Sequence, residues 1–411
     1  MTSRWHDPRR LAGPFTDRRS RRLLGAFLVS ELGAGITAVV VPLGVYAVSD
    51  SVVALASTFL GRMIFGSIFA AVGGIIADRM DRRLLLLASY VVRALLVAAL
   101  VPLANGHAVA FAVVGVLVGA SGSFDNPAAE AALRSTYRHD LQVLAAARKS
   151  GKTVSQMIGP AVGGVLFGLG GLPLALSANV LTFMAALVLL STRRAPPVRQ
   201  RIVTVRRPGP RPTVAAALAS LRGRVPPVVM MAFLSAASAS FLVAVATALA
   251  VPYLAGLPHA PAGAYGFALS AYSVGALAGL WLAGSISWGR IRLRIVLLCS
   301  AIAFGALTIL SVSVPHWEMF AFAWLVWGIA FGPEDVVGDT RVATVVPDAW
   351  LSRVYAAWSI LGRLGAAGGY VLVIAVGGLG ARQTLFILGI IYAVTVPAAL
   401  MLLPRETPDE T

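Results

Sequence analysis

The chain has few of the residues on which soluble enzymes usually rely for catalysis. Its 411 residues include one cysteine, five histidines and only 12% charged residues. The single cysteine, Cys299, excludes an intrachain disulfide, and the histidines are scattered over the termini and loops. Gly151-Lys152-Thr153 lacks the first glycine of a phosphate loop, and no metal-ligand cluster or nucleophilic triad is evident. We therefore expect no enzymatic activity, no nucleotide site, no metal and no cofactor.

The composition is instead strongly apolar, with 58% hydrophobic residues and a mean hydropathy of +0.82. Such a chain cannot be covered by a polar surface in water, which favours a lipid-facing exterior. A helix needs about 20 mostly apolar residues to cross the hydrocarbon core. Twelve runs of this kind occur, at residues 23–48, 51–77, 84–103, 107–129, 150–170, 173–192, 226–254, 262–286, 294–314, 317–338, 354–376 and 382–403. The sequence therefore predicts an all-α membrane protein with twelve transmembrane helices.

The twelve runs fall into two groups of six, separated by a polar segment. The predicted organisation is a basic cytoplasmic N-terminus (1–22), an N-terminal six-helix bundle (23–192), a basic cytoplasmic linker (193–225), a C-terminal six-helix bundle (226–403) and a cytoplasmic tail (404–411). Prolines and like charges forbid a packed core in the linker. We interpret the linker as a solvated segment whose charge sets the topology, and a short interfacial helix over residues 214–221 is the alternative.

The two groups of runs also resemble each other in sequence. A shift of 206 residues aligns Pro127 with Pro333, Gly159 with Gly365, Gly163 with Gly369 and Gly171 with Gly377. Because each group has six spans, both groups begin on the same side of the membrane. The halves are therefore predicted to be parallel repeats, related by an axis along the membrane normal.

Basic residues outnumber acidic ones by 34 to 17, which gives a net charge of +17. In a soluble protein this excess would suggest nucleic acid, but its position along the chain points to the membrane. If the N-terminus is cytoplasmic, Arg382 is the only basic residue in an outside loop. Positive residues favour the cytoplasmic side. We predict a bacterial cytoplasmic (inner) membrane protein with both termini inside and with the bilayer, not nucleic acid, as its partner.

The segment between the second and third runs carries a charged motif. It reads Gly74-x-x-x-Asp78-Arg79-x-x-Arg82-Arg83. This motif resembles the loop between helices two and three of the major facilitator superfamily. The resemblance extends over the whole chain and implies the major facilitator fold and a transporter that works by alternating access. Two positions depart from the family pattern, since Asp81 stands where glycine is usual and Trp288 replaces the aspartate of the second copy.

In that family the motif acts as a conformational latch. The resemblance implies that Asp78 lies against the start of helix eleven, near residues 351–355, and that Arg82 pairs with Glu130 or Asp125. A carboxylate at a helix N-terminus gains about 0.3–1 kcal/mol, because that end carries about half a positive charge. Losing such contacts shifts the balance between two packings. The alternative is that the arginines of the motif only set the topology.

The fifth run contains Ser155-x-x-x-Gly159-Pro160-Ala-Val-Gly163-Gly164. This segment is similar to a glycine-proline motif of the family's antiporters, which its symporters generally lack. Small residues let helices approach closely, and proline removes a backbone donor and bends the helix. The segment is therefore predicted to form a close helix contact, and the similarity implies export by antiport.

Six charged residues within the predicted spans are candidates for a functional role, because a charge at this depth costs about 2.5–3.5 kcal/mol. They are Glu31, Arg62, Arg93, Asp125, Glu334 and Asp335. Such residues must face a cavity or a partner. We interpret them as the set that couples protons and lines a substrate cavity.

Glu31 is the main candidate for proton coupling, because a stripe of small residues continues its face toward protein or a cavity. A cationic substrate would displace a proton from this carboxyl group, and later proton binding would release the substrate. The alternative is a structural ion pair between Glu31 and Arg62 or Arg93. For Glu334 and Asp335, a solvated helix end is as good an explanation as coupling.

These features predict proton-coupled export of a small organic compound, such as an antibiotic or other drug. The overall pattern resembles the bacterial drug, macrolide and siderophore exporters of the superfamily. The expected partners are a small-molecule substrate, protons and the lipid bilayer, and we expect a monomer. Export of a siderophore or secondary metabolite, or import of a nutrient, is the alternative within transport. A transporter-like sensor or scaffold is the alternative outside it.

Overall fold

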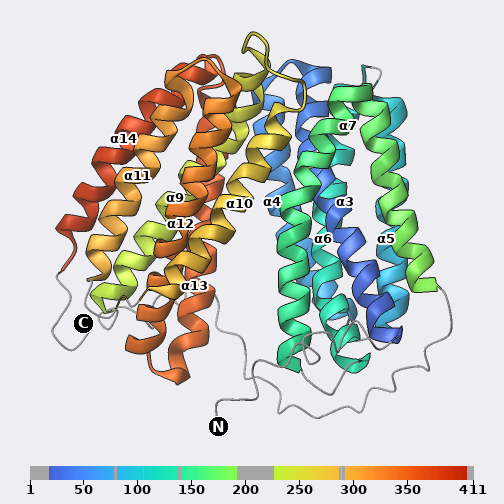
Figure 1. Ribbon diagram of the computed structural model, residues 1–411, viewed down its shortest axis with the longest axis horizontal. Coiled ribbons are helices and arrows are strands. Elements are labelled where there is room, and N and C mark those ends of the chain that lie inside the picture. Colours follow the sequence, from blue (N-terminus) through green and yellow to red (C-terminus); the bar gives the residue numbers. More distant parts are fainter. Residues whose placement is uncertain are drawn as a thin grey trace. The chain divides into compact units, whose positions relative to one another are not determined.

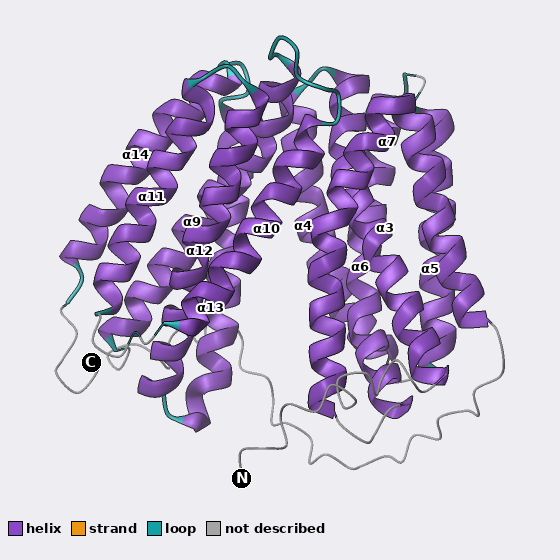
Figure 2. Ribbon diagram, in the orientation of Figure 1, coloured by secondary structure: helices purple, strands orange, loops and turns teal. Residues whose placement is uncertain are grey.

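The computed structural model describes residues 18–77, 81–104, 106–136, 141–191, 226–286, 288 and 292–404. Within these residues every regular element is a helix (Figure 2). The chain divides into two compact units. One unit is Met1–Arg199 with Pro261–Ser270, and the other is Gln200–Ala260 with Ala271–Thr411. The predicted linker, 193–225, lies outside the described residues.

Helices α3 to α7 of the first unit are coloured blue to green in Figure 1. They are α3 (Arg18–Ser49), α4 (Val52–Ala77), α5 (Arg82–Leu103), α6 (Ala108–Thr136) and α7 (Leu141–Ser191). α3 packs most extensively on α7, and α6 packs on both α4 and α5. α7 consists of two helical segments that join at Gly170 and Gly171. Gly171 has φ of +63° and ψ of −159°, a conformation essentially restricted to glycine, so its residue type permits the break.

The second unit contains helices α9 to α14, although the first residues of α10 group with the first unit. They are α9 (Pro227–Ala255), α10 (Ala264–Ser285), α11 (Leu293–Ser313), α12 (Trp317–Val345), α13 (Asp348–Ala375) and α14 (Ala381–Leu402). α9 packs on α13, and α11 packs on both α12 and α14. The two helix pairs α3 with α7 and α9 with α13 therefore form the corresponding main contacts of their units.

Ten of the described helices are long and apolar enough to cross a membrane. One of the ten, α7, holds two segments, and α6 adds a shorter apolar stretch, Ala108–Ser123. The described residues thus contain twelve apolar helical segments at the predicted places. Large apolar side chains are widely exposed, for example Leu169 at 76% and Trp281 at 71%. Soluble proteins rarely expose so much apolar surface, so the prediction of an all-α membrane protein is confirmed.

Four helices extend well beyond the predicted spans. α6 continues to Thr136 instead of 129, α12 continues to Val345 instead of 338, α7 begins at Leu141 instead of 150, and α13 begins at Asp348 instead of 354. The additional turns carry charged residues such as Arg341 and Arg353. A hydropathy pattern detects only the part of a helix that lies in the hydrocarbon layer. The backbone hydrogen bonds of the helix can continue beyond that layer.

The glycines aligned by the repeat make corresponding contacts in the two units. A Cβ on Gly159 of α7 would lie only 2.8 Å from the Cα of Gly35 in α3. A Cβ on its counterpart, Gly365 of α13, would lie 3.0 Å from the Cα of Ala237 in α9. In both units the missing side chain lets the first and fifth helices approach closely.

Two arginines make a second pair of corresponding contacts. Arg83, at the start of α5, donates from Nη2 to the carbonyl oxygens of Leu190 and Ser191 at the end of α7, at 2.6 and 3.2 Å. Arg294, at the start of α11, donates from Nη2 to the carbonyl oxygen of Leu403 just after α14, at 2.8 Å. The last carbonyls of a helix lack intrahelical donors and carry a partial negative charge. In each unit an arginine therefore fastens the third helix to the end of the sixth.

Arg382, the only basic residue predicted to lie outside, makes the reverse contact in the second unit. It stands at the start of α14 and donates to the carbonyl oxygens of Val312 and Ser313 at the end of α11, at 3.0 and 3.2 Å. α11 and α14 are thus fastened to each other at both ends. Arg382 is an exception to the predicted excess of basic residues on the cytoplasmic side. Its position has a structural explanation, since it caps the end of α11.

Replacing Arg294 by glutamine should loosen the end of α14. The change removes charge-assisted bonds to three carbonyl oxygens, those of Met401, Leu403 and Pro404. Because the site is partly exposed, we expect a loss of about 1 kcal/mol. The midpoint of thermal unfolding in detergent should fall by about 2–4 °C. Arg292→Gln is the control and should not change the midpoint, and equal midpoints for both variants would contradict the assigned contact.

Candidate functional site

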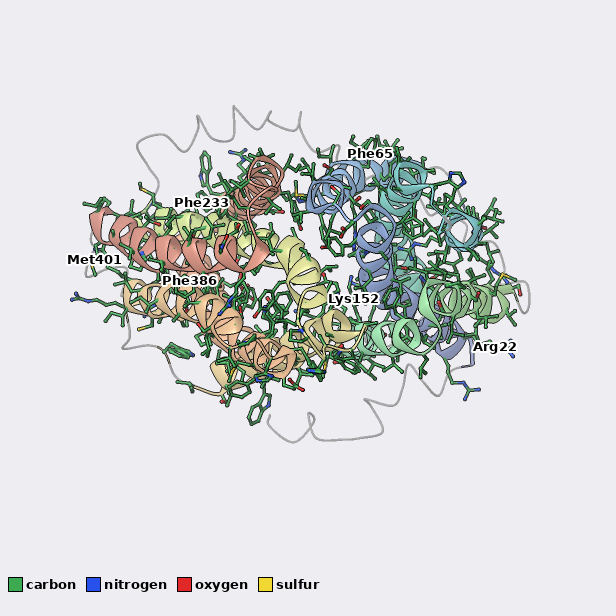
Figure 3. The ribbon with its side chains drawn as sticks, turned by 90° about the horizontal axis from the view of Figure 1, so that it is seen from above. Arg22, Phe65, Lys152, Phe233, Phe386 and Met401 are labelled. Atoms are coloured by element: carbon green, nitrogen blue, oxygen red, sulfur yellow. The ribbon has the colours of Figure 1, made fainter. Side chains whose placement is uncertain are left out.

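Glu31 lies within α3, and only 13% of its side chain is exposed. Its Oε2 lies 3.7 Å from the Nζ of Lys152 on α7, a residue labelled in Figure 3. This ion pair joins the two helices that pack most extensively in the first unit. The alternative interpretation of Glu31 named Arg62 or Arg93 as its partner, and the ion pair that the structure shows is with Lys152 instead. The rotation of α7 about its axis, which brings Lys152 to α3, is not visible in hydropathy.

Arg62 and Arg93 instead lie against α6. Arg93 of α5 is buried and donates from Nη1 to the Oγ of Ser30 at 3.2 Å. Its guanidinium also lies against Gly122, where a Cβ would collide with it. The aliphatic part of Arg62 lies against Gly119 in the same way. Two glycines one turn apart on α6 therefore make room for the arginines of α4 and α5.

The glycine-proline segment of α7 lies against α3. Beyond the contact of Gly159, a Cβ on Gly163 would lie 3.2 Å from the Cα of Ile36. Gly164, the next residue, lies against the backbone of Gly266 near the start of α10, in residues that group with the first unit. The segment thus forms two close backbone contacts, and a larger side chain would block each of them.

Only part of the charged motif is described. Asp78 and Arg79 lie outside the described residues, as do the side chains of Arg82, Asp125 and Glu130. The predicted latch therefore stays a prediction.

Asp81, the departure from the usual glycine, has a structural role at the start of α5. It is the N-cap of this helix, and its Oδ1 accepts a hydrogen bond from the backbone N of Arg83 at 2.8 Å. Aspartate is a preferred N-cap because its carboxylate satisfies a backbone donor that the helix leaves free. Together with the side chain of Arg83 at the end of α7, this contact fixes how the segment enters α5.

The second unit contains a cavity of about 460 Å³ between α9, α10, α12 and α13. The described residues of its lining are mainly small or aromatic, and among them only Glu334 and Asp335 of α12 are charged. α12 approaches α10 closely where Gly332 meets Gly279, directly before these acids. The cavity is thus an apolar space with two carboxyl groups on one wall.

Glu334 is buried, with 7% exposure, whereas Asp335 is exposed. The Oγ of Ser235 on α9 donates to the Oε1 of Glu334 at 2.5 Å. Among the described residues, no basic side chain forms an ion pair with Glu334. A solvated helix end, one of the two explanations for this residue, is therefore wrong for Glu334. The carboxyl group lies instead in the protein interior at a cavity wall.

Sequence reasoning missed Lys152 and Ser235, the partners of Glu31 and Glu334. Ser235 belongs to a helix rich in small residues and carries no pattern of its own. Lys152 did carry a signal, because it is one of only two lysines beside 32 arginines. Its place in an arginine-rich segment suggested a topology charge, although a long flexible ammonium differs from a guanidinium as an ion-pair partner.

The sequence profile of the Major Facilitator Superfamily matches residues 23–249 and, a second time, residues 233–411. This chain belongs to that superfamily. It is therefore a multi-pass membrane transporter of a small-molecule substrate. The two matches also confirm the predicted fold class, in which two six-helix repeats follow each other along the chain.

Solved structures of superfamily transporters share this fold over nearly the whole chain. The nucleoside transporter NupG is 14% identical, with a TM-score of 0.71 over 94% of this chain and 98% of its own. A bacterial homolog of the human lysosomal transporter Spinster is 16% identical, with a TM-score of 0.68 over 95% and 98%. A D-xylose-proton symporter is 15% identical, with a TM-score of 0.65 over 96% and 98%. A search of curated proteins finds no match.

Replacing Gly159 by leucine should separate α3 from α7. The new side chain would meet the backbone of α3 within 3 Å, and overpacking of this kind costs about 1–3 kcal/mol. We expect less monodisperse protein after purification and a thermal midpoint lower by several degrees. Gly168→Leu is the control on the same helix, because its Cβ would have no neighbour nearer than 4.0 Å. If both leucine variants are equally stable, the close contact at Gly159 is not what holds the helices together.

Proposed function

We propose that this transporter exports a small organic compound, such as an antibiotic or other drug, in exchange for protons. The observation that supports this best is Glu334, a buried carboxyl group at a cavity wall with a serine hydroxyl as its partner. Ionisable residues inside a membrane protein usually mark the path of a substrate or a proton. The similarity of the glycine-proline segment of α7 to antiporters agrees with exchange.

The coupling follows from the cost of the charge on Glu334. An ionised carboxylate at membrane depth costs about 2.5–3.5 kcal/mol, and binding a proton removes this cost. A substrate that binds only to the ionised carboxylate of Glu334 cannot bind while this group holds a proton. Substrate and proton therefore compete for the same site. One proton that moves down a potential of 100 mV supplies about 2.3 kcal/mol. At about 1.4 kcal/mol per tenfold ratio, this supports a gradient of about fiftyfold for an uncharged substrate.

Two other parts of the chain belong to this proposal. Glu31 is a second carboxyl group that exchanges a proton during the cycle, and protonation would release Lys152 from its ion pair. Asp78, with Arg79, Arg82 and Glu130, forms the latch that favours one of the two conformations. The cytoplasmic location of both termini, the bacterial inner membrane and the monomeric state complete the assignment.

Uptake of a nutrient is the second candidate, because a D-xylose-proton symporter and a nucleoside transporter share the fold over almost the whole chain. The two candidates differ in the direction of net transport. An exporter lowers the accumulation of its substrate in energised cells, whereas an importer raises it.

Replacing Glu334 by glutamine should abolish proton-coupled export while the protein still folds, since the amide keeps the shape and a bond to Ser235. We would express the chain in a bacterium that lacks its own efflux pumps, and measure drug resistance and dye efflux with and without a protonophore. The unsubstituted protein should raise both, and the protonophore and Glu334→Gln should each remove the gain.

The control for this test is Glu318→Gln, which changes an exposed acid in the first turn of the same helix. It should transport like the unsubstituted protein. Protonophore-sensitive efflux by the Glu334 variant would disprove the coupling role. Increased accumulation of solutes by the unsubstituted chain would favour the importer.

Glu31 can be tested together with its partner. Glu31→Gln should abolish pH-driven transport, and the double variant Glu31→Gln with Lys152→Gln should not restore it, because the proton site is gone in both. The measurement is substrate flux in proteoliposomes under an imposed pH gradient. If the double variant regains flux, the pair is structural, and the defect of the single variant came from a lysine left without its anion.

A further inference from the structure

A short hydrogen bond joins Glu334 of α12 to α9. The Oγ of Ser235 donates to the Oε1 of Glu334 at 2.5 Å, and the two side chains are buried, with 4% and 7% exposure. A hydroxyl that donates over about 2.5–2.7 Å is typical of an ionised acceptor, and such a bond is about twice as strong as one between neutral groups. A proton that binds to Glu334 therefore weakens this bond. The strength of the contact between α9 and α12 thus depends on the charge of the carboxyl group.

A second serine of α9 leads from Ser235 toward α14. Ser238 lies one turn further along α9, and its Oγ donates to the carbonyl oxygen of Ser235 at 3.0 Å. The same Oγ lies 3.5 Å from the Oη of Tyr392 on α14, a side chain that is buried with 5% exposure. Since the hydroxyl hydrogen of Ser238 is used within α9, Tyr392 is the donor in this contact. Polar contacts thus lead from Glu334 across α9 to α14.

The contact between Ser238 and Tyr392 is the adjustable one. At 3.5 Å it lies beyond the usual range of about 2.5–3.0 Å for bonds between hydroxyl groups, so a small movement of α9 closes or opens it. The first unit offers a comparison, because a short bond joins its first and sixth helices. There the Nδ2 of Asn179 donates to the Oγ1 of Thr37 at 2.7 Å, and both side chains are buried. That contact is already closed, whereas the contact between α9 and α14 has room to tighten.

Tyr392 belongs to a helix that is fastened to α11 at both ends. Arg294 joins the start of α11 to the end of α14, and Arg382 joins the start of α14 to the end of α11. Between these ends the two backbones approach closely, since a Cβ on Gly389 of α14 would lie 3.0 Å from the carbonyl oxygen of Gly305 of α11. A displacement of Tyr392 is therefore shared by both helices.

Other groups that can carry a charge lie on the helices around Glu334. They are Asp335 on α12, Tyr272 on α10, Tyr392 on α14, and Arg363 and Tyr370 on α13. The sequence of α9 adds only Tyr253 near its end, and that of α11 adds Arg294 at its start and Cys299. The bond from Ser235 distinguishes Glu334 from these neighbours. A response to pH that requires both Glu334 and Ser235 is therefore assigned to this carboxyl group.

We propose that three hydroxyl groups transmit the protonation state of Glu334 to the helix pair α11 and α14. This hydroxyl relay consists of Ser235, Ser238 and Tyr392. The ionised carboxylate holds Ser235 close to α12, and a bound proton weakens that hold, so that α9 moves and the contact between Ser238 and Tyr392 changes. The inference rests on the proposed function, in that Glu334 is taken as the proton site. It adds the positioning residues through which proton binding acts on the conformation.

The test uses the single cysteine of the chain as a reporter. Cys299 lies on α11 with an exposed side chain, so the purified full chain can be labelled there with monobromobimane, whose fluorescence depends on its surroundings. The measurement is the bimane fluorescence in detergent while the pH is lowered, without substrate and without a proton gradient. The fluorescence of the unsubstituted chain should change with pH, and Glu334→Gln should abolish this change.

Variants of the hydroxyl relay separate transmission from proton binding. Ser235→Ala should lose most of the fluorescence change, because a hydrogen bond to a charged group is worth a factor of about ten or more in an equilibrium. Ser235→Thr keeps a hydroxyl group at this position and should restore the response. Tyr392→Phe keeps the ring but removes the donor to Ser238, so this variant should also lose most of the change.

Two matched controls lie on α9. Thr247→Val removes a hydroxyl that donates to the carbonyl oxygens of its own helix, and Tyr253→Phe removes an Oη that has no hydrogen-bond partner among the described residues. Both should respond like the unsubstituted chain. A full response in Ser235→Ala or Tyr392→Phe would overturn the proposal. An equal loss in the controls would also overturn it, because the response would then depend on general packing.

The two proposals fail in different ways. If the label on Cys299 does not respond to pH but efflux is protonophore-sensitive and depends on Glu334, then the hydroxyl relay is wrong and the transport proposal stands. If the label responds through Glu334 and Ser235 but a protonophore leaves efflux unchanged, then the relay stands and proton-coupled export is wrong.

Discussion

Inside a hydrocarbon layer a polar atom can find its partner only within the protein. This constraint accounts for most specific contacts of the structure. The guanidinium of Arg93 meets a serine, the carboxylate of Glu31 meets Lys152, and the carbonyls at helix ends meet arginines. Glycines make some of these contacts possible. Gly119 and Gly122 on α6 leave the space that Arg62 and Arg93 occupy. Where a charge has no opposite charge nearby among the described residues, as at Glu334, its partner is a neutral hydroxyl group, that of Ser235.

The two halves share a scaffold but differ in their polar content. Close glycine contacts between the first and fifth helices and an arginine from the third helix to the end of the sixth occur in both. The first unit contains an ion pair between Glu31 and the partly exposed Lys152, whereas Glu334 and Asp335 of the second unit line a cavity. Duplication explains the common scaffold.

The fold was predictable from the sequence because hydropathy reports directly on the need to satisfy the backbone in lipid. The twelve segments and the break at Gly170 and Gly171 follow from that signal and from glycine's freedom. The helix extensions were not predictable, since a helix in water needs no apolar run.

The candidate site was predictable only in part. Charges at membrane depth were correctly singled out as residues that need partners, but the partners depend on how each helix turns about its axis. Lys152 illustrates the difficulty, because its charge and position suited the topology rule equally well. The contacts of Ser235 with Glu334 and of Tyr272 with Trp324 have no sequence pattern, because each joins two different helices.

The reciprocal arginine caps of α11 and α14 have a mechanical meaning. A pair of helices fastened at both ends resists shear, so this pair can act as a rigid strut during rocking. α5 and the second segment of α7 are fastened through Arg83 at one end, and the sequence has no arginine or lysine at the other end, between Arg93 and Arg134 or between Lys152 and Arg193. That other end carries the break at Gly171, which has a backbone conformation essentially restricted to glycine. At this point the first repeat thus holds a glycine joint, whereas the corresponding point of the second repeat is joined by Arg382.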